Sequence, residues 1–206
     1  MSNRYTVHGT QGAMEPGSDG SVLANKLGIT DAAEMAEAEL LLLEQLYEAV
    51  LVAELPLRQL TVADLFSWHR RWLGNVYPFA GLQRGVNASK DGFMFAAAAQ
   101  VPRLLEEFER DCLARYTPAL IGDRTRLVQA IAETHAELIL IHPFVEGNGR
   151  LARLLADVMA VQAGHEPLDY SDWDARREDY FAAIRAALGR DYSGLQQLVD
   201  TALGAA

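Results

Sequence analysis

The chain has very little cysteine: Cys112 is the only one among 206 residues. A lone cysteine in an apolar stretch supports neither a disulfide framework nor a cysteine-based metal site. This composition fits a reducing compartment, and we expect the protein to be cytoplasmic.

Long apolar runs are also missing. No segment approaches the roughly 20 apolar residues that a membrane-spanning helix requires. Residues 1–20 lack the apolar centre and cleavage site of a signal peptide. We therefore expect a soluble protein without a membrane partner.

Basic residues are few relative to acidic ones. Lys and Arg number 18 against 28 Asp and Glu, which gives a net charge of -10. An overall negative field repels nucleic acid and anionic membranes. We expect neither as a partner.

The first 20 residues are polar, rich in glycine and without periodicity, so they predict a loose tail that carries no chemistry. The remaining length suits one compact domain, residues 21–206. No repeat or linker divides it.

Apolar residues recur at helical spacing over most of this domain. In residues 77–95 the helical spacing disappears and turn-forming residues surround a short extended segment, 83–89, which predicts a hairpin or flap. The sequence thus predicts an all-α fold with one small β-element. The predicted helices cover 31–54, 61–73, 101–116, 123–141, 149–164, 173–188 and 192–203, and Thr61 with Asp64 predicts a capping box at the start of the second.

The most informative segment is 142–153, HPFVEGNGRLAR. Pro143 disfavours helical backbone at His142, so the preceding helix should end there and the imidazole should project as a base. Gly147, Asn148 and Gly149 permit positive φ angles and are followed by a helix. Backbone N–H groups in such a turn, with a helix N-terminus, form a nest for an anion. The Asn148 side chain is expected to help stabilise the charge of phosphate oxygens there.

Arg150 and Arg153 lie on one side of that helix's first turn. Two cations at a helix N-terminus oppose the macrodipole, which favours a bound anion beside them. A polyphosphate would occupy both guanidinium groups. Glu146 then suits a Mg²⁺ ion that bridges phosphate oxygens.

This segment resembles the Fic family signature H-x-F-x-[D/E]-G-N-G-R-x-x-R at all eight specified positions. Such a match arises by chance less than about once in a million sequences. Residues 25–29, 77–81 and 89–91 resemble family features as well. The resemblance extends over residues 23–203.

The resemblance implies a Fic-type helical bundle with a β-hairpin flap over the active site. It implies transfer of AMP from ATP to a Ser, Thr or Tyr hydroxyl of another protein, with His142 as catalytic base. Lys90 and Asp91 on the flap would contact the ligands and align the target. Tyr180 and Phe181 match an aromatic pair that lines the adenine pocket, whereas Leu188 stands where some relatives carry Asn.

Many members are inhibited by a helix with the pattern [S/T]-x-x-x-E-[G/N]. Its nearest match here is 30–34, but Met35 follows, so we interpret this segment as a plain helix start. We therefore expect inhibition by a small antitoxin-like protein. Small bacterial relatives act as toxins on the ATPase subunits of DNA gyrase and topoisomerase IV, which makes these the first targets to test.

Other functions stay open. Related sequences with altered motifs transfer phosphate, phosphocholine or UMP, and some relatives remove AMP. A non-catalytic nucleotide-binding module is the alternative of another class, although no motif position is damaged here. His69 and His135 lie outside the signature, and we expect them to be core or surface residues.

Overall fold

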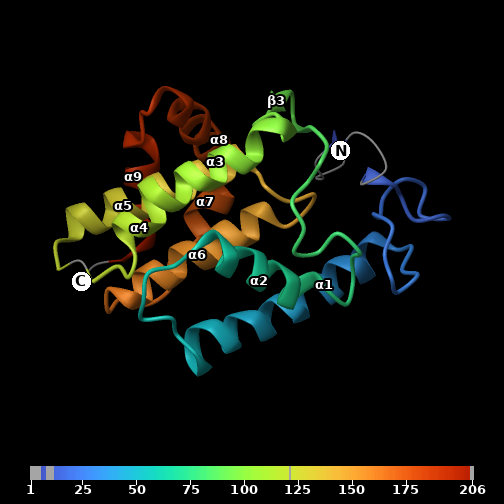
Figure 1. Ribbon diagram of the computed structural model, residues 1–206, viewed down its shortest axis with the longest axis horizontal. Coiled ribbons are helices and arrows are strands. Elements are labelled where there is room, and N and C mark those ends of the chain that lie inside the picture. Colours follow the sequence, from blue (N-terminus) through green and yellow to red (C-terminus); the bar gives the residue numbers. More distant parts are fainter. Residues whose placement is uncertain (1–5, 8–11, 121, 205–206) are drawn as a thin grey trace.

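The computed structural model describes residues 6–7, 12–120 and 122–204. Within them the fold is helical with one small sheet, as predicted (Figure 1). The helices are α1 Ala32–Tyr47, α2 Val62–Leu73, α3 Val101–Phe108, α4 Ala114–Tyr116, α5 Arg124–Ile141, α6 Asn148–Gln162, α7 Ser171–Ala175, α8 Arg177–Ala186 and α9 Ser193–Ala202.

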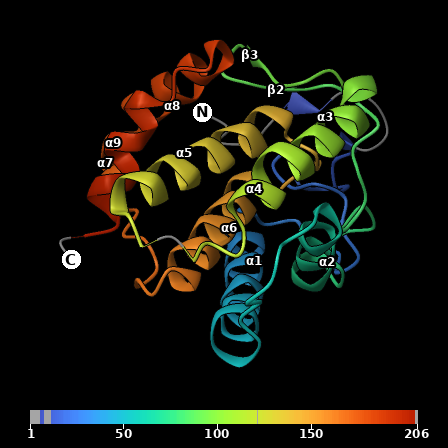
Figure 2. The same cartoon turned by 60° about the vertical axis from the view of Figure 1, so that its left-hand side comes forward.

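Helix α6 is the centre of the fold. It lies between the pair α1 and α2 and helix α5 (Figures 1 and 2). Its buried residues surround the helix, as expected of a helix packed on all sides. Its N-terminus carries the second half of the sequence motif, so the motif rests on a helix that is buried on several sides.

Two helix starts follow the chemistry of their capping residues. The Asp31 carboxylate accepts hydrogen bonds from the N–H groups of Ala33 and Glu34, so Asp31, one residue after Thr30, caps α1. Thr61 and Asp64 form the predicted capping box of α2. The predicted helix 31–54 is α1 followed by a π-helical turn, η2 Glu48–Ala53.

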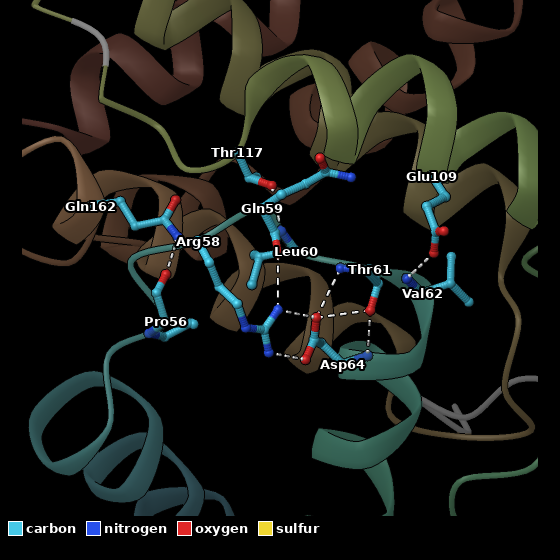
Figure 3. A network of polar contacts seen from close by, with 10 residues as sticks. All are labelled: Pro56, Arg58, Gln59, Leu60, Thr61, Val62, Asp64, Glu109, Thr117 and Gln162. Atoms are coloured by element: carbon cyan, nitrogen blue, oxygen red, sulfur yellow. Dashed lines mark hydrogen bonds and ion pairs between the residues drawn. The ribbon is translucent and has the colours of Figure 1, made fainter.

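Figure 3 shows the polar contacts that hold the connection into α2. The Gln162 amide at the end of α6 donates to the Pro56 carbonyl over 2.5 Å. The Thr117 hydroxyl accepts from the Leu60 N–H over 2.7 Å. These contacts tie the α1–α2 connection to both α6 and the segment after α4.

The sheet has three short antiparallel strands in the order β1-β2-β3. Strands β2 Ala88–Lys90 and β3 Phe93–Met94 form the predicted hairpin, which lies near the start of α8 (Figure 2). The extended part begins five residues later than predicted. Strand β1 Thr6–Val7 pairs with β2 and was not predicted.

The prediction of a loose tail over 1–20 is wrong for residues 12–20. They form turns, and Ser18 is 4% exposed with its hydroxyl donating to the Glu15 carbonyl. Residues 1–5 and 8–11 lie outside the described residues. Gly17 and Gly20 have positive φ angles, which lets this polar segment fold back on itself.

The predicted helix 173–188 is divided. Helix α7 ends at Ala175 and α8 begins at Arg177, because Arg176 has non-helical angles of φ -106° and ψ 48°. None of the helices in the described parts is long and apolar enough to cross a bilayer.

Candidate active site

One cavity of about 980 Å³ opens at the N-terminus of α6, between α1, the flap and α8. It brings together all but one of the residues that the sequence singled out. These lining residues are Lys90, Asp91, His142, Glu146, Gly147, Gly149, Arg150, Arg153, Tyr180 and Phe181.

His142 follows directly after α5 in the left-handed conformation, with φ 52° and ψ 60°. Its Nδ1 lies 3.2 Å from the Ile139 carbonyl, which can only accept, so Nδ1 carries the proton and Nε2 the lone pair. The Phe95 ring stacks on the imidazole with centroids 3.7 Å apart. The geometry gives His142 one orientation and one tautomer.

The pKa of His142 is lowered to about 3, mainly by burial and also by the charges of Arg84 and Lys90, while the hydrogen bond to the Ile139 carbonyl opposes this shift. The side chain is 1% exposed. A neutral imidazole is therefore the form present near neutral pH, and its lone pair can accept a proton.

Gly147 lets the loop turn into α6. It has φ 84°, and a Cβ at this position would lie 2.7 Å from Cζ3 of Trp72. Neither a left-handed backbone nor this contact suits a larger residue. The Gly147 N–H donates to Oε1 of Glu146 over 2.8 Å.

Fewer residues form the predicted anion nest than the sequence suggests. Only Gly147 of the three loop residues has a positive φ, and Asn148 and Gly149 already belong to α6. The groups available to bind an anion here are thus the first-turn N–H groups of a helix, which lack intrahelical acceptors.

The prediction that the Asn148 side chain contacts phosphate is wrong for this conformation. Its Oδ1 accepts from the Phe144 N–H and its Nδ2 donates to the Phe144 carbonyl, both over 2.9 Å. Asn148 is 1% exposed and does not line the cavity. The amide holds the loop in shape, because Phe144 needs both a donor and an acceptor.

Arg150 is held by two carboxylates and a ring. It contacts Glu39 over 2.7 Å and Glu146 over 3.3 Å, and its guanidinium lies 4.6 Å from the ring centroid of Trp72. Glu39, on α1, also accepts from the Tyr77 hydroxyl over 2.5 Å. Sequence reasoning missed Glu39, since only the fold brings α1 to the motif.

Arg153 is paired with a residue that the sequence did not indicate. Its guanidinium contacts both oxygens of Asp174 on α7, over 2.6 and 3.3 Å. It also lies 4.7 Å from the ring centroid of Tyr170. The two motif arginines are thus presented to the cavity with carboxylate partners.

The flap reaches α8 through its turn. Lys90 Nζ lies 5.7 Å from the centroid of the Phe181 ring, within the range of a cation–π contact. Asp91 occupies the turn with φ 49°. The flap residues and the aromatic pair therefore line neighbouring walls of the same cavity.

Two histidines that sequence reasoning set aside support this site from behind. His135 is 2.9 Å from the Tyr180 hydroxyl through Nε2 and 3.2 Å from the Ala152 carbonyl through Nδ1. His69 contacts the Glu146 carbonyl through Nε2 over 3.0 Å and the Gly81 N–H through Nδ1 over 2.8 Å. Their spacing in the sequence gave no signal, because each acts through tertiary contacts.

The described residues include no group of three His, Cys, Asp or Glu side chains that would enclose a metal. Glu146 contributes a carboxylate to the cavity beside the α6 N-terminus. Mg²⁺ is often held by one or two carboxylates, with water and phosphate oxygens completing its shell. The residues present thus fit a magnesium–nucleotide complex rather than a closed protein site.

A family model described as Fic/DOC family matches residues 59–160, about half of the chain and all of the motif. The chain belongs to the Fic/DOC family. Among its relatives is a protein adenylyltransferase Fic of Drosophila persimilis, 32% identical over 111 residues, which are 53% of this chain and 21% of that protein. A protein of the same name from Nematostella vectensis is 30% identical over 129 residues, 62% of this chain and 29% of the other. This Fic chain therefore matches less than a third of the length of these relatives.

Solved Fic structures share the fold over nearly the whole chain. BepC of Bartonella tribocorum, crystallised with bound AMPPNP, has a TM-score of 0.73 at 20% identity and covers 92% of this chain and 94% of its own. An N-terminal Fic domain from Bartonella quintana with bound ADP has a TM-score of 0.69 at 21% identity, covering 87% and 89%. At these identities the likeness establishes the fold.

Proposed function

We propose that this Fic chain is a protein adenylyltransferase that transfers AMP from ATP to a hydroxyl side chain of another protein. The observation that carries the proposal is the placement of His142. Its neutral imidazole shares one cavity with the N-terminus of α6, Arg150 and Arg153. A base and a polyphosphate site are thereby combined.

In the proposed reaction the target hydroxyl oxygen attacks the α-phosphorus of ATP while Nε2 of His142 accepts its proton. The new O–P bond forms as the bond from the α-phosphorus to the bridging oxygen breaks, and pyrophosphate leaves. General-base catalysis of this kind typically contributes about 10²- to 10⁴-fold. The Nδ1–H bond to Ile139 keeps the lone pair on Nε2.

The first-turn N–H groups of α6 would bind phosphate oxygens, and Arg150 and Arg153 would bind the β- and γ-phosphates. Glu146 would hold Mg²⁺, which neutralises phosphate charge when bound. The aromatic wall with Tyr180 and Phe181 would take the adenine ring. Support for ATP also comes from the bound AMPPNP and ADP of the two Bartonella proteins.

The flap would present the target. Strand β1 already pairs with one edge of β2, whereas Phe93 and Phe95, in and after β3, line the cavity. A target segment would therefore pair in extended form along β3, by the main-chain mode that sheet edges offer. By family analogy we propose a toxin that acts on the ATPase subunits of DNA gyrase or topoisomerase IV, restrained by a separate antitoxin-like protein.

The test is to incubate a bacterial lysate with the purified chain and ATP labelled at either the α- or the γ-phosphate. Label on protein from α-labelled ATP alone would support AMP transfer. Label from γ-labelled ATP would indicate phosphoryl transfer instead. His142→Ala is the matched control, and the labelled band identifies the target. ATP binding without labelled protein in any lysate would contradict the proposal.

A further inference from the structure

Arg84 is a fully buried arginine, 0% exposed, in the segment between α2 and β2. Its guanidinium donates to four main-chain carbonyls rather than to a carboxylate. A buried charge is costly unless its donors are satisfied. Because main-chain carbonyls alone satisfy this buried charge, the role of Arg84 follows from the segments that it joins.

The four carbonyls belong to two separate elements. Ile141 ends α5 and His142 follows it, and the carbonyls of His142 and Ile141 lie 2.5 and 3.1 Å from the guanidinium nitrogens. Val86 and Ala96 flank the flap hairpin, and their carbonyls lie 2.7 and 2.6 Å away. One planar side chain thus joins the catalytic end of α5 to both ends of the flap.

The electrostatics explain why a cation lies here. The last carbonyls of a helix have no intrahelical donor and carry a partial negative charge. The left-handed turn at His142 adds its own carbonyl to this group. The rigid fork of an arginine can reach several such acceptors at once, which a lysine ammonium cannot do.

We propose that Arg84 is a positioning residue that fixes the flap relative to His142. Two neighbouring contacts also join the flap to the end of α5. The Ala96 N–H donates to the Leu140 carbonyl over 3.1 Å, and the Phe95 ring stacks on His142. Arg84 does not line the cavity. Loosening it should therefore displace the flap and the base while leaving the nucleotide walls in place.

The kinetic consequence rests on the proposed AMP transfer. A target held by the flap must place its hydroxyl against Nε2, and displacement by about 1 Å can cost about 10²-fold in rate. In the proposed reaction the phosphates of ATP are bound by the N-terminus of α6, Arg150 and Arg153 rather than by Arg84. Loss of Arg84 should therefore lower kcat much more than it raises KM for ATP.

The experiment compares Arg84→Lys and Arg84→Gln with Arg124→Lys in the full chain. Arg124 is a matched control because it contacts Asp200 through both a carboxylate and a carbonyl, at the far end of α5. Hydrogen exchange of peptides covering 86–96 and 140–143 is measured first and needs no activity. Both Arg84 variants should exchange at least about tenfold faster there, with kcat at least about tenfold lower and KM for ATP changed less than about threefold. Arg124→Lys should change none of these by more than twofold.

Unchanged exchange of the flap in a folded Arg84 variant would overturn the proposal, whatever the activity. A wild-type chain that transfers no AMP while the exchange result holds would refute the proposed function and leave the positioning role intact. Global unfolding of both variants would also overturn the proposal, because it would assign Arg84 to overall stability.

Discussion

Arg153 and Asp174 form a two-point ion pair at the rim of the cavity, with nitrogen–oxygen distances of 2.6 and 3.3 Å. The Asp174 side chain is 67% exposed, so the pair is weakly held and can open. In the proposed reaction Arg153 binds phosphate. Asp174 then competes with the nucleotide for the same guanidinium group.

Asp174→Asn should therefore tighten nucleotide binding. We expect KM for ATP to fall about two- to fivefold at low salt, and the difference from wild type to shrink at high salt. The matched control is Asp172→Asn, which removes the same charge from the same helix but frees Arg176. Steady-state kinetics at several ATP concentrations test this. An equal fall in both variants would indicate a general charge effect, and a rise in KM for Asp174→Asn would contradict the competition.

The pH dependence of transfer should reflect a base that stays neutral. Because burial lowers the pKa of His142 to about 3, the imidazole keeps its lone pair well below its usual titration range near 6.5. We expect kcat/KM to be flat between pH 8 and 5 wherever the chain stays folded, as judged by circular dichroism. Loss of activity with a midpoint near pH 6.5 in folded protein would show that His142 titrates normally.

Local residue chemistry predicted most of the helices, although not the break at Arg176, and it also predicted the capping box at Thr61 and Asp64 and the end of α5 before Pro143. Each depends on residues a few positions apart, which a sequence displays directly. The motif residues were predicted for the same reason. Their convergence on one cavity follows from the consecutive placement of α5, loop and α6.

The rest depends on contacts between distant segments. Glu39 meets Arg150 across 111 positions, and Arg84 meets His142 across 58. Strand β1 is two residues long and is stabilised by pairing with β2 rather than by its own sequence. The sequence predicts that the Asn148 side chain contacts the ligand, because it does not display the bond to Phe144, which forms only in the folded loop.

Gly147 should be far less tolerant of alanine than Gly164. Both have left-handed backbones, with φ 84° and 85°, so both substitutions carry a strain of about 1–2 kcal/mol. A Cβ at Gly164 meets nothing within 4 Å, whereas one at Gly147 lies 2.7 Å from Trp72. We expect Gly147→Ala to cost about 1–3 kcal/mol more, measured by urea unfolding, and to lower kcat at least tenfold. Equal costs in the two variants would contradict the importance of the Trp72 contact.

The Tyr180 hydroxyl should position the ring that lines the cavity. The Ala152 carbonyl can only accept, so it fixes the proton on Nδ1 of His135, and the Tyr180 hydroxyl donates to Nε2. Tyr180→Phe leaves that nitrogen unsatisfied, at a cost of about 1–3 kcal/mol. We expect KM for ATP to rise several-fold with kcat within about threefold. The matched control, Tyr192→Phe, removes a hydroxyl bonded to Glu137, also on α5 but away from the cavity, and should leave KM unchanged. A kcat effect without a KM effect would count against a nucleotide-positioning role.

Acid should destabilise this fold in a defined pH window. Burial lowers the pKa values of His69, His135 and His142 to about 4, 4 and 3, whereas an unfolded histidine titrates near 6.5. Between pH 6.5 and 4.5 the unfolded chain thus binds up to about three more protons at these residues, so stability falls as pH falls. Asp157 opposes this, because burial raises its pKa to about 6 and the folded chain binds its proton first.

The net excess of about two protons predicts that the free energy of unfolding falls by about 2–3 kcal/mol per pH unit in this window. Urea unfolding at pH 6.5, 5.5 and 4.5 measures the slope. His69→Asn removes a group that binds a proton in the unfolded chain, so it should make the slope shallower by the equivalent of about one proton. Asp157→Asn removes a group that binds a proton in the folded chain, so it should make the slope steeper by a similar amount. If both variants keep the slope of the wild type, these buried groups titrate alike in the folded and unfolded states. Opposite changes in the two variants would instead locate the acid sensitivity in the buried histidines beneath the cavity rather than in the surface carboxylates.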